Sequence, residues 1–251
     1  MIVNRLYKNI AIFLLACSAT ISVNAQYFYI GGQAGAYTYT STLQNSMGQR
    51  LMDYDFTFGI GGNLLLGYNF DDMHEIRVGM GYTPAGSRRI GGGLVFQNDM
   101  MYYSLSANYL FTPDWFVGST HLYFGGGLSA NIIGNVETQY EVNGVERTFL
   151  EYVEFNNPNN PNRDKIRNLV QQNDGNVPDE NFFNPFDLRI NAMIGIKSEL
   201  SDQLLIHAEL ITMLSMADIN HPDWRLSRRD GEYKSSRNLI GGLVIGFTYI
   251  L

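Results

Sequence analysis

Bulky apolar residues alternate with small or polar residues in eight segments of the chain. Strict alternation over several residues predicts a β-strand whose two faces meet different surroundings. The predicted strands are 27–40, 56–70, 75–83, 101–111, 122–132, 187–199, 204–214 and 239–251. In the last of them, mostly smaller residues separate the bulky positions Leu243, Ile245, Phe247, Tyr249 and Leu251.

The connections between these segments alternate between short and long. Short turns follow the second, fourth and sixth segments, at 71–73, 112–114 and 201–203, and longer polar stretches follow the others. The longest stretch, 134–186, is unusual for a compact soluble domain. Membrane barrels have short turns at one rim and long loops at the other, so we expect 134–186 to be an extracellular loop.

The polarity of the two faces separates a membrane barrel from a soluble one. The polar face is rich in glycine, serine and asparagine and lacks the lysine and glutamate runs of a solvated sheet. A soluble lipocalin-like barrel, the alternative, packs its apolar face inward. Here the small polar face suits a narrow lumen and the bulky face suits lipid, and a spanning sheet must close to pair its edges. We therefore predict an all-β fold, an eight-stranded antiparallel up-and-down transmembrane β-barrel.

The first 25 residues have the layout of a secretory signal peptide. Two basic residues precede the apolar run 10–16, and the small-residue site 23–25 follows. The run is too short to span a bilayer, which needs ~20 apolar residues. Lipidation of Cys17 at a lipoprotein-like box is the alternative. Either route exports the chain, and we predict that 26–251 forms the barrel domain.

Composition excludes several classes of function. The net charge of −7 becomes −9 without the first 25 residues, which hold two basic and no acidic residues, so we expect no nucleic-acid partner. Cys17 is the only cysteine, and its removal would leave no thiol or disulfide chemistry. The sequence contains no metal-ligand spacing, phosphate loop or dinucleotide fingerprint. We therefore expect no cofactor and no metal.

Several stretches resemble the PorT-like family of small outer-membrane β-barrels of Gram-negative bacteria, with motifs shared by OmpA- and OmpX-type barrels. They are VGMGY at 78–82 with AGSR at 85–88, YYSL through YLF at 102–111, LYFGGGL at 122–128, Asn238, and GFTY at 246–249. The resemblance implies contact with outer-membrane lipid and recognition of the last strand by the barrel-insertion machinery, through Leu243, Ile245, Phe247, Tyr249 and Leu251. The family's name-giving member is linked to protein secretion, which implies an accessory role in an envelope secretion or assembly machine. The length of 134–186 and the terminal leucine depart from the plainest pattern.

Charged and titratable residues on the inward parity form the strongest candidate site. If 201–203 is a turn, Lys197 lies opposite His207. Buried charges must be paired, so we expect an ion-pair network across the barrel floor. A proton or ion path is the functional interpretation. A structural plug is favoured, because side chains fill an eight-stranded barrel. The predicted members are Glu75, Arg77, Arg189, Lys197, Glu199, His207 and Glu209.

Catalysis has weaker support. His221 has Asp218, Asp223 and Ser227 near it in sequence, the residue types of a hydrolase triad. Polar loops bring such residues together by composition alone, so we expect a non-enzymatic structural or interaction protein. A lipid-modifying enzyme is the alternative. We expect the stretch 134–186 to be solvated, or to bind an envelope protein, a glycan or a cation.

Overall fold

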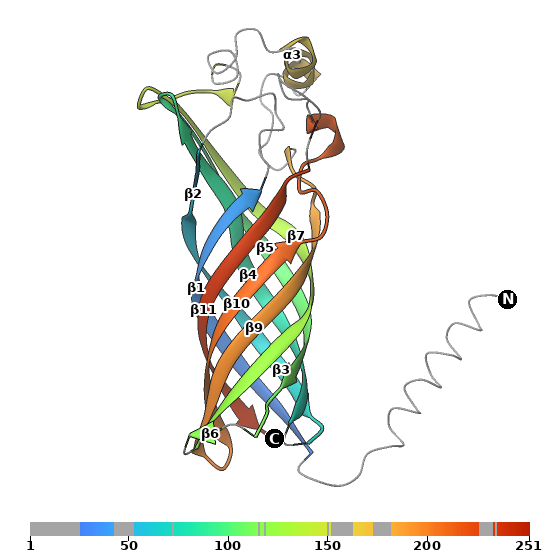
Figure 1. The fold of residues 1–251 in the computed structure, drawn as a ribbon. Helices are drawn as coiled ribbons and strands as arrows, with labels where there is room; N and C mark the ends of the chain where they lie inside the picture. The colour runs from blue at the N-terminus through green and yellow to red at the C-terminus, as the bar shows by residue number, and fades with distance from the viewer. Residues whose placement is uncertain are drawn as a thin grey trace, which may run out of the picture.

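The computed structural model describes residues 26–42, 53–71, 73–114, 116–117, 119–149, 151, 163–172, 182–225, 233 and 235–251. Eight long strands pair with their neighbours in chain order, all antiparallel, and the last pairs with the first to close a barrel (Figure 1). The predicted fold class is confirmed. The strands are β1 (Tyr27–Thr42), β3 (Thr57–Asn69), β4 (His74–Gly91), β5 (Leu94–Phe111), β7 (Thr120–Val142), β9 (Phe186–Ser201), β10 (Leu204–Ser215) and β11 (Arg237–Ile250).

Several short strands and helices accompany the eight long strands. β2 (Asp53–Asp55) pairs with β4, while β6 (Phe116–Val117) and β8 (Val145–Glu146) pair with β7. The helix α3 (Arg163–Gln172) and the 3-10 helix η3 (Pro222–Trp224) complete the described elements. Figure 1 shows the C-terminus and β6 at one end, here called the terminal end, and α3 at the other, the loop end. The predicted signal peptide and Cys17 lie outside the described residues.

Two of the segments expected to be loops contain extensions of the long strands. The stretch between the third and fourth predicted strands is a hairpin, because β4 and β5 continue to a turn at Gly92 and Gly93, whose φ angles are 58° and 79°. Positive φ at both central residues is typical of a tight hairpin turn. Pro84 lies within β4, where it pairs with Met101 of β5 just beyond the last β3–β4 pair, Gly62 and Tyr82. Proline is tolerated in a strand at a position that lacks a neighbour on one side.

The expected 134–186 loop is also partly ordered as secondary structure. β7 continues past Gly134 to Val142, turns at Asn143 and Gly144, and pairs with β8. The sheet therefore projects beyond the rest of the barrel at the loop end, and α3 follows within the same segment.

The two faces of the wall differ as the alternation predicts. Outward side chains on β3 are bulky, apolar and exposed: Phe58 is 77% exposed and Ile60 is 73% exposed. Inward positions hold tyrosine, asparagine, serine and charged residues that are almost fully buried, among them Tyr37, Tyr102 and Asn131. The buried core of this fold is its lumen, and the outer wall presents an apolar belt.

Candidate functional site

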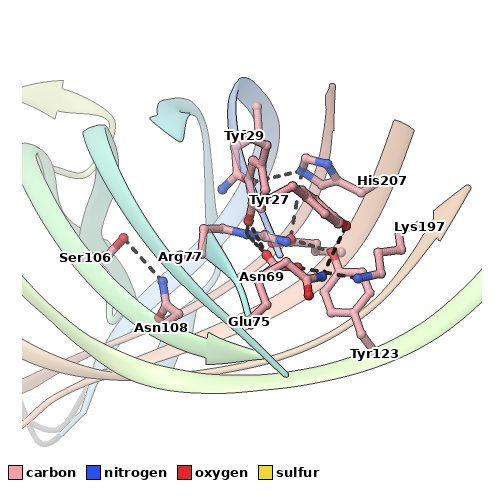
Figure 2. Close-up of polar contacts among 12 residues, drawn as sticks. Tyr27, Tyr29, Asn69, Glu75, Arg77, Ser106, Asn108, Tyr123, Lys197 and His207 are labelled. Carbon is pink, nitrogen blue, oxygen red and sulfur yellow. Dashed lines mark hydrogen bonds and ion pairs between the residues drawn. The ribbon is translucent and has the colours of Figure 1, made fainter. Parts of the chain in front are cut away.

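A network of charged and phenolic side chains crosses the lumen near the terminal end (Figure 2). Arg77 of β4 is at its centre: its Nε lies 3.3 Å from Oε1 of Glu75 and its Nη1 pairs with Glu209 of β10. The Tyr29 hydroxyl donates to Glu75, and the Tyr123 hydroxyl donates to Glu209 at 2.6 Å. All five side chains are buried, so each carboxylate has both a cation and a phenol as partners.

Lys197 and His207 extend this network toward β1 and β9. Lys197 Nζ lies 3.5 Å from Oε2 of Glu75. His207 Nε2 lies 3.2 Å from Oε1 of Gln33 and 3.9 Å from Oε1 of Glu209. We call the set Tyr29, Glu75, Arg77, Tyr123, Lys197, His207 and Glu209 the floor network.

Strand parity and register explain why these residues meet. Glu75 and Arg77 are two apart on β4 and therefore share a face. Lys197 is the cross-strand partner of His207, the pairing expected from a 201–203 turn. Ser201 pairs with Leu204, and a register shift between Leu204 and Leu205 brings Lys197 and His207 opposite each other. Two cations, Arg77 and Lys197, face two carboxylates, so the charges balance. Such an arrangement holds strands together across the lumen, because removing one partner leaves a buried charge uncompensated.

Two predicted members of the network lie elsewhere. Arg189 is fully buried higher in the lumen, where its Nε lies 2.6 Å from Oδ2 of Asp187 and its guanidinium carbon lies 4.4 Å from the centre of the Tyr102 ring. Glu199 is exposed at the terminal end, and no ion pair joins it to the described residues. The structure thus brings together five of the seven predicted side chains.

Sequence reasoning missed Tyr29, Tyr123 and Gln33. Tyr123 alternates with outward Leu122 and Phe124, so its inward parity was available from the sequence. Its role as a hydrogen-bond donor to Glu209 depends on which strands face each other across the lumen, and periodicity alone does not specify that.

Above the floor network the lumen is narrow and polar. Asn191 Nδ2 donates to Oδ1 of Asn108 at 3.2 Å, and Asn108 Nδ2 donates to Oγ of Ser106 at 3.4 Å. The cavity at this level has a volume of about 30 Å³, enough for about two water molecules. Side chains therefore occupy most of this part of the lumen.

Aromatic side chains from distant segments pack together at the loop end. The ring of Phe182 lies 4.5 Å from that of Trp224 in η3 and 4.8 Å from that of Phe149, measured between centroids. Tyr140 of β7 connects this cluster to Phe96 of β5. We call Phe96, Tyr140, Phe149, Phe182 and Trp224 the loop-end cap. Because α3 buries Ile166 and Val170 in the same core, part of the 134–186 segment packs against the barrel.

The triad candidates at the loop end have structural partners. Asp218 accepts a hydrogen bond from the Tyr233 hydroxyl and lies 3.0 Å from Nε of Arg225. Burial, followed by this hydrogen bond, raises the pKa of Tyr233. His221 Nδ1 accepts from the backbone N–H of Asp223 at 3.4 Å, and Ser227 lies outside the described residues. Asp218 and His221 therefore make separate contacts.

The described residues contain neither a cluster of metal-ligand side chains nor a membrane-spanning helix. No group of three or more histidine, cysteine, aspartate or glutamate side chains is placed to hold a metal ion. No helix in the described ranges has the length and apolar character needed to cross a membrane.

The positions of the last strand that we predict to face lipid lie on the outer wall. Ile245, Phe247 and Tyr249 are 52%, 50% and 45% exposed, while Val244 before them and Thr248 between Phe247 and Tyr249 are buried. β11 pairs with both β1 and β10, so the strand predicted to carry the assembly signal is also the seam that closes the barrel.

Comparison with known proteins finds similar barrels at low sequence identity. No family model matches the chain. Outer membrane protein P1 of Haemophilus influenzae is 31% identical over 81 residues, which are 32% of this chain and span only 18% of that protein. The solved structure of a major outer membrane protein from Thermus thermophilus is similar over 91% of this chain and 100% of that one, with a TM-score of 0.48 and 12% sequence identity. The structure of the outer membrane protein OprG from Pseudomonas aeruginosa is similar over 90% of this chain and 95% of that one, with a TM-score of 0.46 and 13% sequence identity. The fold of this chain is established by its own strand pairing, an eight-stranded antiparallel barrel.

Proposed function

We propose that this protein is a non-enzymatic outer-membrane β-barrel that presents its loop end to the medium as an interaction surface. The observation that carries the proposal is the filled lumen: the floor network spans it near the terminal end, and the loop-end cap packs over the other end. An apolar belt of outward side chains supports a lipid environment. A filled barrel in lipid serves as an anchor for what it displays.

Site-specific photo-crosslinking in intact cells tests the displayed surface. A photoreactive residue at Val145 or Arg147, both exposed at the loop end, should give discrete adducts with one or a few envelope or extracellular proteins. The same residue at Val142, which is buried in the adjoining strand, is the matched control and should give none. Adducts from Val142 alone would contradict the assignment of the binding face.

Conductance separates an anchor from a channel. Purified protein in planar bilayers should give no steady ion current, because the cavity above the floor network has room for about two waters. Regular single-channel steps that disappear on replacing residues of the floor network would make the lumen a conduction path and overturn the proposal.

The resemblance to PorT-like barrels supports a second candidate, an accessory subunit of an envelope secretion or assembly machine. Stable copurification with other envelope proteins would favour it. A lipid-modifying enzyme remains the other alternative, and comparison of lipid A with and without the protein tests it directly.

A further inference from the structure

The lumen widens at the terminal end into a vestibule below the floor network. Its volume is about 430 Å³, within the range of small-ligand sites. The wall includes Asn69 of β3, Thr112 and Asp114 after β5, Lys197 and Glu199 of β9, and Leu205 of β10. Figure 2 shows Asn69 beside Tyr27, to which it is hydrogen-bonded, with Lys197 nearby.

Two buried oxygen atoms in this wall have no hydrogen-bond partner among the described residues. Asn69 is 3% exposed and donates from Nδ2 to the Tyr27 hydroxyl at 3.2 Å, which leaves its Oδ1 unpartnered. Thr112 is 4% exposed, and its Oγ1 is likewise unpartnered. Buried polar atoms are normally hydrogen-bonded. The two oxygens therefore indicate that a group with hydrogen-bond donors occupies the vestibule and donates to them.

The charge around the vestibule favours a cation. Asp114 and Glu199 are exposed in its wall, and Asp202 is exposed in the adjoining β9–β10 turn. Lys197 is the one lysine or arginine among the described wall residues, and Glu75 above it already pairs with its ammonium group. The mouth therefore carries more carboxylates than available cations.

We propose that the vestibule binds an arginine or lysine side chain that a partner protein presents at the terminal end of the barrel. A guanidinium group has five N–H donors and no acceptor, which complements a wall offering Asn69 Oδ1, the Thr112 hydroxyl and two carboxylates. Charge-assisted hydrogen bonds to Asp114 and Glu199 would hold it at the mouth. This site lies at the opposite end from the interaction surface proposed above, so the two stand or fall separately.

A methyl NMR titration of the folded full-length barrel in nanodiscs tests this site. The probe is acetyl-Arg-Arg-Arg-amide at a fixed, near-physiological salt concentration, and the control peptide replaces each arginine with citrulline, which has nearly the same shape but no charge. We expect a saturable shift of the Leu205 methyl signals with the arginine peptide and at least about tenfold weaker binding of the citrulline peptide, because the charge-assisted hydrogen bonds are lost. Equal binding of both peptides, or no saturable shift, would overturn the proposal and leave water as the only occupant.

Two single substitutions locate the contact. Thr112→Val removes the hydroxyl at nearly constant volume, and Glu199→Gln removes an exposed charge without disturbing a buried pair. Each should weaken binding of the arginine peptide about tenfold, the usual effect of losing a hydrogen bond to a charged group. Glu146→Gln, at the loop end, is the control and should leave the affinity unchanged. Unchanged affinity in both vestibule variants would show that the peptide binds elsewhere.

Discussion

Inward glycines stand directly opposite the large side chains of the floor network. Gly67 pairs with Tyr29, Gly195 with Tyr123, and Gly246 with His207. A Cβ atom at any of the three positions would collide with the ring opposite. The small inward face seen in the sequence therefore has a specific cause, because each glycine makes room for a ring that lies across the strand.

Gly195→Ala tests this pairing. The added methyl would lie 2.5 Å from Cζ of Tyr123 and should push the phenol away from Glu209, lowering the free energy of unfolding by ~1–3 kcal/mol. Urea unfolding of the purified protein in liposomes measures the loss. Gly126→Ala on β7 is the matched control, because its Cβ would meet only a carbonyl oxygen at 3.5 Å. Equal losses at both positions would contradict the steric explanation.

Arg77 should be the most sensitive charge in the barrel. Arg77→Met would leave Glu75 and Glu209 without their shared cation in a buried site, a loss of ~3–5 kcal/mol in unfolding free energy. Arg88→Met is the control, because the side chains of the Arg88–Asp55 pair are about half exposed and such a pair is worth at most ~1 kcal/mol. Thermal unfolding in detergent compares the two, and an Arg77 variant as stable as the parent would mean that water reaches this level of the lumen.

At the scale of the strand, alternation predicts which way a side chain points but not how high it lies in the barrel. Arg189 and Lys197 both point inward from β9, yet eight residues separate them, about 27 Å along a strand. The sequence therefore placed both in one network, whereas the structure separates the Arg189–Asp187 pair from the floor network. To predict the position of a side chain along the barrel axis, one needs the register of every strand. That register depends on turn geometry and bulges around the whole ring.

The ends of strands were predicted less well than their centres for a related reason. Pro84 and the glycines at 91–93 are typical of loops, but here they lie in a hairpin. β5 pairs with both β4 and β7 as far as Leu94, and β4 lacks a partner on its other side only around Pro84, between its pairs with β3 and with β2. Proline and glycine in the sequence suggest that a strand ends, but they do not show whether a neighbouring strand pairs with the chain at that position.

Neighbouring positions on β10 test the two faces of one strand. Leu210 is 59% exposed on the outer wall, and Ile211 is buried beside Glu209 and the polar mid-lumen. Leu210→Asn would place an amide without hydrogen-bond partners in lipid, at a cost of ~1–3 kcal/mol, and should reduce the amount of folded barrel, whereas Ile211→Asn places the same amide among the polar side chains of the mid-lumen and should be tolerated better. Heat-modifiable mobility on gels measures the folded fraction. Equal defects would mean that the alternation does not mark a lipid boundary.

At the scale of the molecule, two features limit the functions open to the barrel: its sheet is closed, and side chains occupy its lumen. β11 joins β1 over fourteen residue pairs, from Tyr29–Ile250 to Thr42–Arg237, so no edge is left open to lipid along this seam. The floor network and the loop-end cap then occupy the lumen from its two ends. In the function that we propose, the resulting molecule is an anchor with a structured surface at the loop end and an acidic vestibule at the terminal end.

Single-cysteine labelling in intact cells tests the central claim, a closed barrel that spans the outer membrane with its loop end outside. Val145→Cys at the loop end should react with a membrane-impermeant maleimide in intact cells, Asp202→Cys at the terminal end should react only after the outer membrane is permeabilised, and Ile245→Cys on the outer wall should react under neither condition. All three positions are exposed in the structure, so burial within the protein does not mask them. Labelling of Asp202→Cys in intact cells with protection of Val145→Cys would reverse the orientation, and ready labelling of Ile245→Cys would contradict the membrane-spanning barrel.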